Sequence, residues 1–172
     1  MILKAAEFAA TKHRGQFRKG NLNTPYINHP IKVANLLENV GVKDVEVLVA
    51  ALLHDVVEDT NTTYSDIRNV FNQRVADFVL EVTDDKEKSK KERKALQIQN
   101  AKGLSYEAKL IRIADKICNV QDISGKDAPD WSYERKFEYL EWAKKVVDEI
   151  KGTHDVLEVL FYDEHRWGRL KI

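Results

Sequence analysis

The sequence has little of several features that would each mark a particular class of protein. It contains one cysteine, Cys118, among 172 residues, which excludes a framework of internal disulfides and suits a reducing compartment. Lysine and arginine together number 28, as do aspartate and glutamate, so no net charge attracts nucleic acid or an anionic membrane. No apolar run is long enough for a membrane span, and the N-terminus shows no leader pattern. These absences predict a soluble cytoplasmic protein whose ligands are held by local groups.

Strand-like alternation is also nearly absent, and the three prolines and seven glycines interrupt the chain rarely. Helical spacing of apolar residues recurs instead from one end of the chain to the other. The length suits one domain with a core of its own. The sequence therefore predicts an all-α helical bundle in which residues 1–172 form a single domain.

Capping residues and apolar periodicity place the expected helices. They cover residues 2–19, 29–40, 44–60, 106–123, 131–151 and 154–167. A further short helix starts at residue 64, and apolar residues that face the core continue from it to residue 82. A polar turn is expected at 21–28, and the charged segment 83–94 is interpreted mainly as a solvent-exposed face that could lend one or two cations to an anionic ligand. Cys118 is expected in the core, His154 at a helix cap and His165 on a polar face, none with a catalytic role.

The most informative stretch is Leu48–Thr60, which reads LVAALLHDVVEDT. If it forms one helix, His54 and the three acidic residues that follow lie along one edge, and apolar residues cover the rest. Burying an imidazole and three carboxylates costs free energy unless a cation or a partner compensates them. An exposed acidic helix end is the plainer interpretation, but the apolar neighbours count against it. We therefore expect a metal-centred site.

Two further polar residues in apolar surroundings extend this site. His29 opens a helix just before a proline, and Asp115 lies within an apolar helix with Asn119 one turn further on. Taken alone, His29 fits a helix cap and Asp115 fits a salt bridge to a neighbouring cation. With His54 and Asp55 they supply two imidazoles and two carboxylates, which suit one divalent ion such as Mn²⁺, Fe²⁺, Co²⁺, Ni²⁺ or Zn²⁺. The lack of thiolates argues against a closed structural zinc site.

These residues belong to motifs that follow one another along nearly the whole chain. The motifs are His13-Arg14-x-Gln16-x-Arg18-Lys19, Thr24-Pro25-Tyr26-Ile27-x-His29-Pro30, Leu53-His54-Asp55-x-Val57-Glu58-Asp59-Thr60, Val82-Thr83-Asp84-Asp85 with Glu92-Arg93-Lys94, and Ile113-Ala114-Asp115-Lys116-x-x-Asn119. In this set the sequence resembles the HD superfamily of metal-dependent phosphohydrolases, and most closely the hydrolase domain of RelA/SpoT-type enzymes. Since no room remains for a synthetase or regulatory domain, it resembles the small stand-alone forms, the metazoan SpoT homologues and their bacterial counterparts.

The resemblance implies an HD-type bundle that removes the 3′-pyrophosphate of (p)ppGpp, giving GDP or GTP and pyrophosphate, usually with Mn²⁺. It implies metal ligation by His29, His54, Asp55 and Asp115, catalytic roles for Glu58 and Asp59, and nucleotide contacts from Arg18, Lys19 and Asn119. General chemistry agrees, because a bound ion acidifies water, carboxylates can move its proton, and cations neutralise phosphate oxygens. The expected partner is a small nucleotide, with neither nucleic acid nor membrane, and the sequence specifies no oligomeric state.

Two other functions fit the same residues. A metal motif recognises the scissile phosphate rather than the base, so another nucleotide phosphohydrolase, such as one that removes the 2′-phosphate of NADPH, would carry it too. A non-enzymatic alarmone-binding or metal-stabilised module would need the ligands but neither Glu58 nor Asp59, so their presence favours an enzyme. The sequence departs from the family pattern at Cys118, beside the Asp115–Asn119 face, and in the loop 21–23, and neither departure touches a ligand position.

Overall fold

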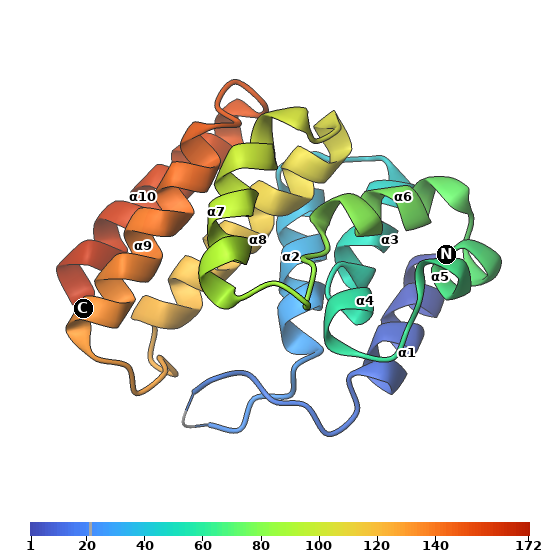
Figure 1. The fold of residues 1–172 in the computed structure, drawn as a ribbon, viewed down its shortest axis with the longest axis horizontal. Coiled ribbons are helices and arrows are strands. Elements are labelled where there is room, and N and C mark those ends of the chain that lie inside the picture. The colour runs from blue at the N-terminus through green and yellow to red at the C-terminus, as the bar shows by residue number, and fades with distance from the viewer. Residues whose placement is uncertain (21) are drawn as a thin grey trace.

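The computed structural model describes residues 1–20 and 22–172, and these form a bundle of helices (Figure 1). The helices are α1 (Ile2–Lys12), α2 (Asn28–Asn39), α3 (Val45–Leu53), α4 (Val56–Asp59), α5 (Tyr64–Val70), α6 (Gln73–Val82), α7 (Lys90–Asn100), the 3₁₀ helix η1 (Ala101–Gly103), α8 (Tyr106–Ser124), α9 (Tyr133–Asp148) and α10 (Asp155–Lys171). No strand occurs among the described residues, apart from one isolated bridge between Phe17 and Pro25. The all-α prediction is confirmed.

Two helices form the centre of the bundle. In α3 every residue from Val47 to Leu53 is buried, and in α8 twelve of the nineteen residues are buried. α8 packs against α2, α3, α6, α9 and α10, while α3 also contacts α1, α2 and α6 (Figure 1). One continuous apolar core results, and it reaches from α1 to α10. Within the described residues, no helix combines the length and apolarity needed to cross a bilayer.

The sequence signals for helix starts are confirmed where a polar side chain caps the first turn. Asp44 caps α3, Ser105 caps α8 and His154 caps α10, each by accepting a hydrogen bond from a backbone N–H of the first turn. The short helix predicted from Tyr64 also begins there. Helices α2 and α8 match their predicted ranges closely, and α9 and α10 differ from theirs by one to four residues at each end.

The first helix is shorter than predicted. It ends at Lys12 rather than near residue 19, because Gly15 has a positive φ of 77°, a conformation that stops an α-helix. The chain beyond it folds back on itself through the bridge between Phe17 and Pro25. The basic residues of the first motif therefore lie on a loop. Of the predicted polar turn at 21–28, Asn21 lies outside the described residues.

The stretch Leu48–Thr60 was predicted to form one helix, but the structure divides it into two. α3 ends at Leu53 and α4 begins at Val56. Nδ1 of His54 lies 2.7 Å from the Ala51 carbonyl oxygen and donates to it, and a continuous helix would give that oxygen to the N–H of Asp55. The side chain thus competes with the backbone, and the break turns His54 and Asp55 toward the middle of the bundle.

The charged segment 83–94 includes the start of α7, where Ser89 and Glu92 form a capping box. One expectation about a side chain was wrong. His165 is buried rather than on a polar face, since it packs on Phe161 and faces Glu141 between α10 and α9. Cys118 lies in the core, as predicted.

The core around α3 generates a stability prediction. Leu53 is fully buried and directly precedes His54, so Leu53→Ala should lower the free energy of unfolding by about 2–5 kcal/mol in urea titrations. Leu3→Ala is the matched control, because Leu3 is 85% exposed and its truncation should change that free energy by less than about 0.5 kcal/mol. Equal losses for the two variants would contradict the assignment of α3 to the core.

Candidate active site

Four of the predicted site residues meet in the centre of the bundle. His29 lies in the first turn of α2, His54 and Asp55 at the junction of α3 and α4, and Asp115 in the middle of α8. Nε2 of His29 is 3.1 Å from Oδ1 of Asp115, and Nε2 of His54 is 3.2 Å from Oδ2 of Asp55. The two crossed distances are 3.8 Å (His29 to Asp55) and 3.7 Å (His54 to Asp115). Three segments distant in sequence thus present two imidazoles and two carboxylates to one point.

The geometry of this cluster fits a metal ion. One ligand atom from each of His29, His54 and Asp55 lies within 4.8 Å of the other two, a span that one ion can bridge. Because Nδ1 of His54 donates to the Ala51 carbonyl, Nε2 is the atom left to face the carboxylates. Nε2 of His54 is buried and has no hydrogen-bond partner of acceptable geometry within the described residues. The cluster can therefore hold a divalent cation, which would complete the ligand set around this nitrogen.

The ionisation of the cluster also reflects a need for positive charge. Burial lowers the pKa of His29, despite its hydrogen bond to Asp115. Burial opposes protonation of His54 too, but the carboxylates of Asp55 and Asp115 outweigh it and raise the pKa of His54 to about 10. Both carboxyl pKa values lie below their ordinary range, since the neighbouring cations outweigh burial. A bound ion would replace the proton on His54, so ion uptake should release a proton.

The two predicted catalytic carboxylates extend from α4 toward the same cavity. Burial, with the nearby charges of Asp84 and Asp55, raises the pKa of Glu58 to about 7, although the N–H of Asp84 donates to Glu58 Oε2 at 3.2 Å. A carboxyl group with a pKa near neutrality can both accept and return a proton at pH 7. Asp59 accepts a hydrogen bond from Lys86 Nζ at 2.6 Å. The two acids thus lie side by side in different environments.

The charged segment does lend cations to the site. Lys86 pairs with Asp59, and Nη1 of Arg93 lies 3.3 Å from Oε1 of Glu58. Lys88, by contrast, pairs with a neighbouring exposed aspartate. The prediction of a mainly solvent-exposed face therefore holds for part of the segment, whereas Lys86 and Arg93 compensate the acids beside the cavity.

The predicted nucleotide contacts lie on another wall. Nη2 of Arg18 donates to Oδ1 of Asn119 at 2.6 Å and to Oδ2 of Asp122 at 2.8 Å. Nδ2 of Asn119 donates in turn to Oδ1 of Asp115 at 2.6 Å, which connects this wall to the cluster. Lys19 lies further out, where burial and the nearby charge of Lys90 lower its pKa.

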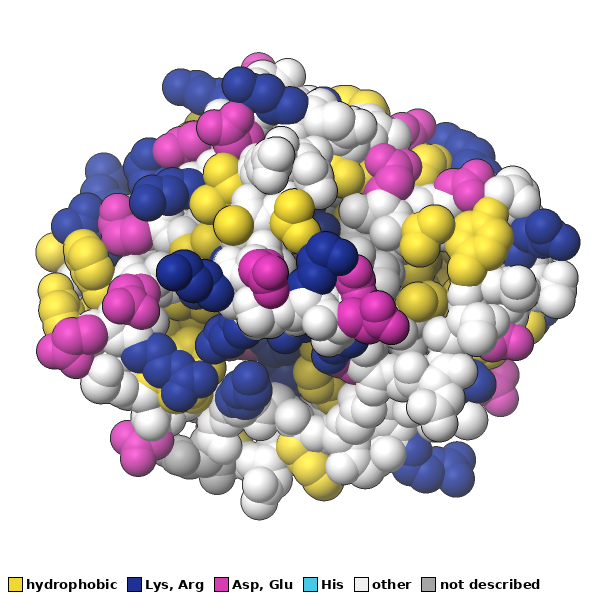
Figure 2. Space-filling view, in the orientation of Figure 1, with side chains coloured by type: hydrophobic (Ala, Val, Ile, Leu, Met, Phe, Trp, Pro, Cys, Tyr) yellow, Lys and Arg dark blue, Asp and Glu magenta, His cyan; other side chains and the backbone are white. Residues whose placement is uncertain are grey.

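Two neighbouring cavities adjoin these groups. The first, of about 160 Å³, contains the His–Asp cluster and is lined almost entirely by polar side chains. The second, of about 300 Å³, is lined by Lys19 and by the aromatic rings of Trp131 and Tyr139. They share four lining residues: Arg18, Tyr26, Asp59 and Asn119. On the face shown in Figure 2, lysine and arginine side chains border a hollow. Phosphate groups can therefore lie beside the cluster while a base stacks on the aromatic rings.

Sequence reasoning missed a role for Tyr26. Its hydroxyl donates to Oδ2 of Asp55 at 2.7 Å and lies 3.2 Å from Oδ2 of Asp59, so it connects a predicted ligand with a predicted catalytic acid. Its ring packs on His13 with the ring centroids 4.7 Å apart. Its position three residues before His29, within a shared motif, is the signal that could have found it.

Asp122 was also missed. It forms an ion pair with Arg18 and a second one with Lys32 at 3.0 Å, and so fixes the guanidinium that faces both cavities. Asp122 follows Asn119 by three residues on α8, which places the two on one helix face. That spacing was the available sequence signal.

The family of the chain follows from comparison with known proteins. The model of the HD domain family matches residues 5–139, well over half of the sequence. The chain belongs to the HD domain family. This confirms the resemblance that the motifs indicated, and it agrees with a cluster built from two histidines and two aspartates on separate segments.

Several members of the HD domain family are similar over most of this chain. Guanosine-3′,5′-bis(diphosphate) 3′-pyrophosphohydrolase MESH1 of Xenopus tropicalis is 50% identical over 159 residues, covering 92% of this chain and 89% of that protein. MESH1 of Homo sapiens is 49% identical over 158 residues, covering 91% and 88%. The bifunctional (p)ppGpp synthase/hydrolase SpoT of Escherichia coli K12 is 35% identical over 128 residues, which are 71% of this chain and 18% of SpoT.

A solved structure agrees with these sequence matches. It is described as a metazoan ortholog of SpoT that hydrolyses ppGpp and plays a role in starvation responses. It superposes with a TM-score of 0.93 at 45% identity and covers 96% of this chain and 93% of its own. The HD-type helical bundle is thereby confirmed along nearly the whole length of both chains.

The cluster predicts how the protein responds to metal removal. Because three segments converge on it, a chelator should lower the melting temperature, and His54→Ala or Asp115→Ala should abolish both the bound ion and this response. Elemental analysis and thermal unfolding with and without chelator measure this. His154→Ala is the control, since His154 caps α10 away from the cluster and its loss should leave the ion content unchanged. Unaltered ion content in the His54 variant would refute the site.

The raised pKa of Glu58 predicts a pH dependence. If ionised Glu58 accepts a proton, kcat falls as the pH drops through about 7, because protonation removes the base. An ion at Asp55 would move this inflection to lower pH without changing its direction. Glu58→Gln should lower kcat by about 10²–10⁴-fold and remove the inflection while the ion is retained.

The control for that pH profile is Glu134→Gln on the exposed start of α9, which should keep both kcat and its pH dependence. An inflection that persists in Glu58→Gln would assign the titration to another group.

Proposed function

We propose that the chain is a metal-dependent guanosine-3′,5′-bis(diphosphate) 3′-pyrophosphohydrolase, which converts ppGpp and water to GDP and pyrophosphate. The MESH1 proteins of Xenopus tropicalis and Homo sapiens bear that activity in their names, and their sequences are 50% and 49% identical to this one over most of the chain. The structurally similar SpoT ortholog is described as hydrolysing ppGpp. The observation that carries the proposal is the polar cavity with its His–Asp cluster, which shares a wall with an aromatic, basic cavity.

The ligand set we propose is His29, His54, Asp55 and Asp115, holding one divalent ion. Mn²⁺ is the ion we propose, and Fe²⁺, Co²⁺, Ni²⁺ or Zn²⁺ suit the same nitrogen and oxygen ligands. When bound, the ion supplies an acidified water and polarises the phosphoryl group. Buried Lys116 lies 3.1 Å from Oδ2 of Asp115 and holds that carboxylate in orientation.

The catalytic acids we propose are Glu58 and Asp59. Glu58, with its pKa near neutrality, accepts a proton from the attacking water. Asp59 is held by Lys86 and by the hydroxyl of Tyr26, and it orients that water. The water oxygen bonds to the phosphorus attached to O3′, the bond from that phosphorus to O3′ breaks, and a proton passes to O3′. GDP and pyrophosphate result.

The substrate-binding residues we propose are Arg18, Lys19 and Asn119. Arg18 and Lys19 border the aromatic cavity and can neutralise phosphate oxygens of the nucleotide. Asn119 lies between the cluster and that cavity, where its amide can contact the ribose or base. Trp131 and Tyr139 offer the stacking surface for guanine.

Two broader predictions from the sequence are also proposals here. We propose that residues 1–172 are a single domain, supported by the one core that connects α1 with α10. We propose a cytoplasmic location, which suits a buried free thiol at Cys118. A small nucleotide is the partner that the site itself supports.

A comparison of two substrates tests the proposed function. With Mn²⁺ at matched ionic strength, ppGpp should give pyrophosphate with a higher kcat/KM than NADPH gives phosphate. Lys19→Ala should chiefly raise KM for ppGpp, since a charge contact to phosphate exists in the ground state too. Lys151→Ala, at an exposed position after α9, is the control and should change neither constant.

The outcomes separate the alternative functions. A clear preference for NADPH, or no hydrolysis of ppGpp, would overturn the substrate while leaving a phosphohydrolase. Release of neither phosphate nor pyrophosphate from any nucleotide by the metal-loaded protein would instead favour a binding module.

A further inference from the structure

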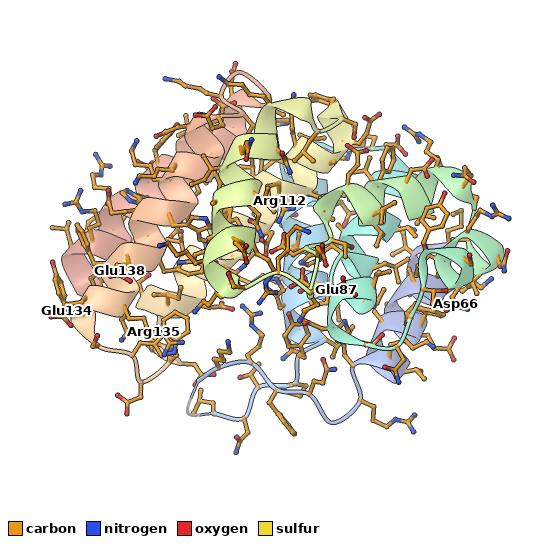
Figure 3. The ribbon with its side chains drawn as sticks, viewed as in Figure 1. Asp66, Glu87, Arg112, Glu134, Arg135 and Glu138 are labelled. Carbon is orange, nitrogen blue, oxygen red and sulfur yellow. The ribbon has the colours of Figure 1, made fainter. Side chains whose placement is uncertain are left out.

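A third cavity continues the space beside the cluster. Its volume is about 320 Å³, and it lies among the end of α6, the segment that follows, α7 and α8. Asp84, Gln97 and Arg112 line both it and the metal cavity, whereas it shares no lining residue with the aromatic cavity. The metal cavity therefore lies between the other two. Figure 3 shows Arg112 in the interior of the bundle and Arg135 near its edge on α9.

Arg112 is a buried cation without an anionic partner among the described residues. Arg112 is only 8% exposed, and its Nη2 donates to the Val82 carbonyl oxygen at 3.0 Å. The other two cations that line the metal cavity, Arg18 and Lys116, are each paired with an aspartate. A buried guanidinium without a counter-charge is costly, and a phosphate group would compensate it with two parallel hydrogen bonds.

The acidic side chains of the third cavity do not fill this role, because each has a partner elsewhere. Glu81 accepts a hydrogen bond from the backbone N–H of Ser105, Asp84 accepts one from Gln97, and Asp85 pairs with Lys88.

Arg93, on α7, supplies a second donor to the same cavity. While Nη1 of Arg93 faces Glu58, its Nε is buried and has no partner within the described residues. Two guanidinium groups, from α7 and α8, thus border the space that begins at the His–Asp cluster. Their donors point to an anionic ligand rather than to a cation or an apolar group.

We propose that Arg112 binds the distal phosphate of the 3′-diphosphate and so makes the enzyme remove pyrophosphate rather than a single phosphate. This inference rests on the proposed function. The reaction places the proximal phosphorus beside the cluster and Glu58, and the nucleoside in the aromatic cavity on one side. The distal phosphate, which leaves still joined to the proximal one, must then extend to the other side, where Arg112 lies.

Direct binding tests this without turnover. With the Mn²⁺-loaded protein, Arg112→Gln should weaken calorimetric binding of pyrophosphate by about 10- to 100-fold, the range expected for loss of a hydrogen-bonded charge contact. Orthophosphate, which occupies the proximal position alone, should bind with nearly unchanged affinity. Arg112→Lys should recover part of the loss because the charge returns. Lys109→Gln, on the same helix but lining neither cavity, is the control and should bind both anions normally.

Steady-state kinetics provide a second test of the role of Arg112. Arg112→Gln should raise KM for ppGpp by a similar factor while sparing guanosine 5′-diphosphate 3′-monophosphate, with ion content unchanged. Arg112→Met, which suits a buried position, replaces the glutamine variant if that one does not fold. Unchanged pyrophosphate binding, or an equal loss for both anions, would overturn the role of Arg112. Failure of the wild-type protein to hydrolyse ppGpp would overturn the proposed function, and pyrophosphate binding would still decide the role of Arg112.

Discussion

The structure depends on a concentration of buried negative charge that the bundle has to compensate. Asp55, between α3 and α4, and Asp115, on α8, each lie near both imidazoles, and neither carboxylate has the solvation it would have at the surface. Two imidazoles, Lys116 and space for a divalent cation offset that cost. Because these groups come from α2, the α3–α4 junction and α8, compensation at the cluster also holds those helices together.

Hydrogen bonds extend the cluster outward in two directions. Tyr26 connects Asp55 with Asp59, and Asn119 connects Asp115 with Arg18. Each connection ends at a residue that lines both the polar and the aromatic cavity. A nucleotide in contact with Arg18 or Asp59 would therefore act on groups that are bonded to the proposed metal ligands, and binding at one cavity would be coupled to geometry at the other.

The region around α7 is held by polar contacts rather than by a core. No residue of α7 is buried as a whole, and the helix reaches the site through Arg93 on Glu58 and Gln97 on Asp84, while the Trp142 indole donates to the Lys94 carbonyl. Since exchange of such contacts costs little free energy compared with opening a packed core, this helix is the wall of the site that can adjust to a phosphate. The proposed ligands, held within the core, and the adjustable wall thus come from different parts of the fold.

The sequence by itself determined the elements with strong local signals. Asp44 and Ser105 cap their helices through side chains next to the backbone they bond, and the apolar spacing of α3 and α8 required burial. The candidate ligands could be found in the same way, because ionisable residues inside apolar helices are costly wherever those helices pack. These features depend on neighbours along the chain.

Only the tertiary structure decided the rest. The break at His54 needs a side chain to compete with its own helix, and the course of the loop after α1 needs Phe17 to pair with Pro25. The ion pair of Arg93 with Glu58 and the hydrogen bond of Tyr26 with Asp55 each join residues about 30 positions apart or more. The lack of an anionic partner for Arg112 depends on which side chains pack around it. Sequence spacing carries no information about such distances, because the packing of α2, α6, α7 and α8 around one charged centre sets them.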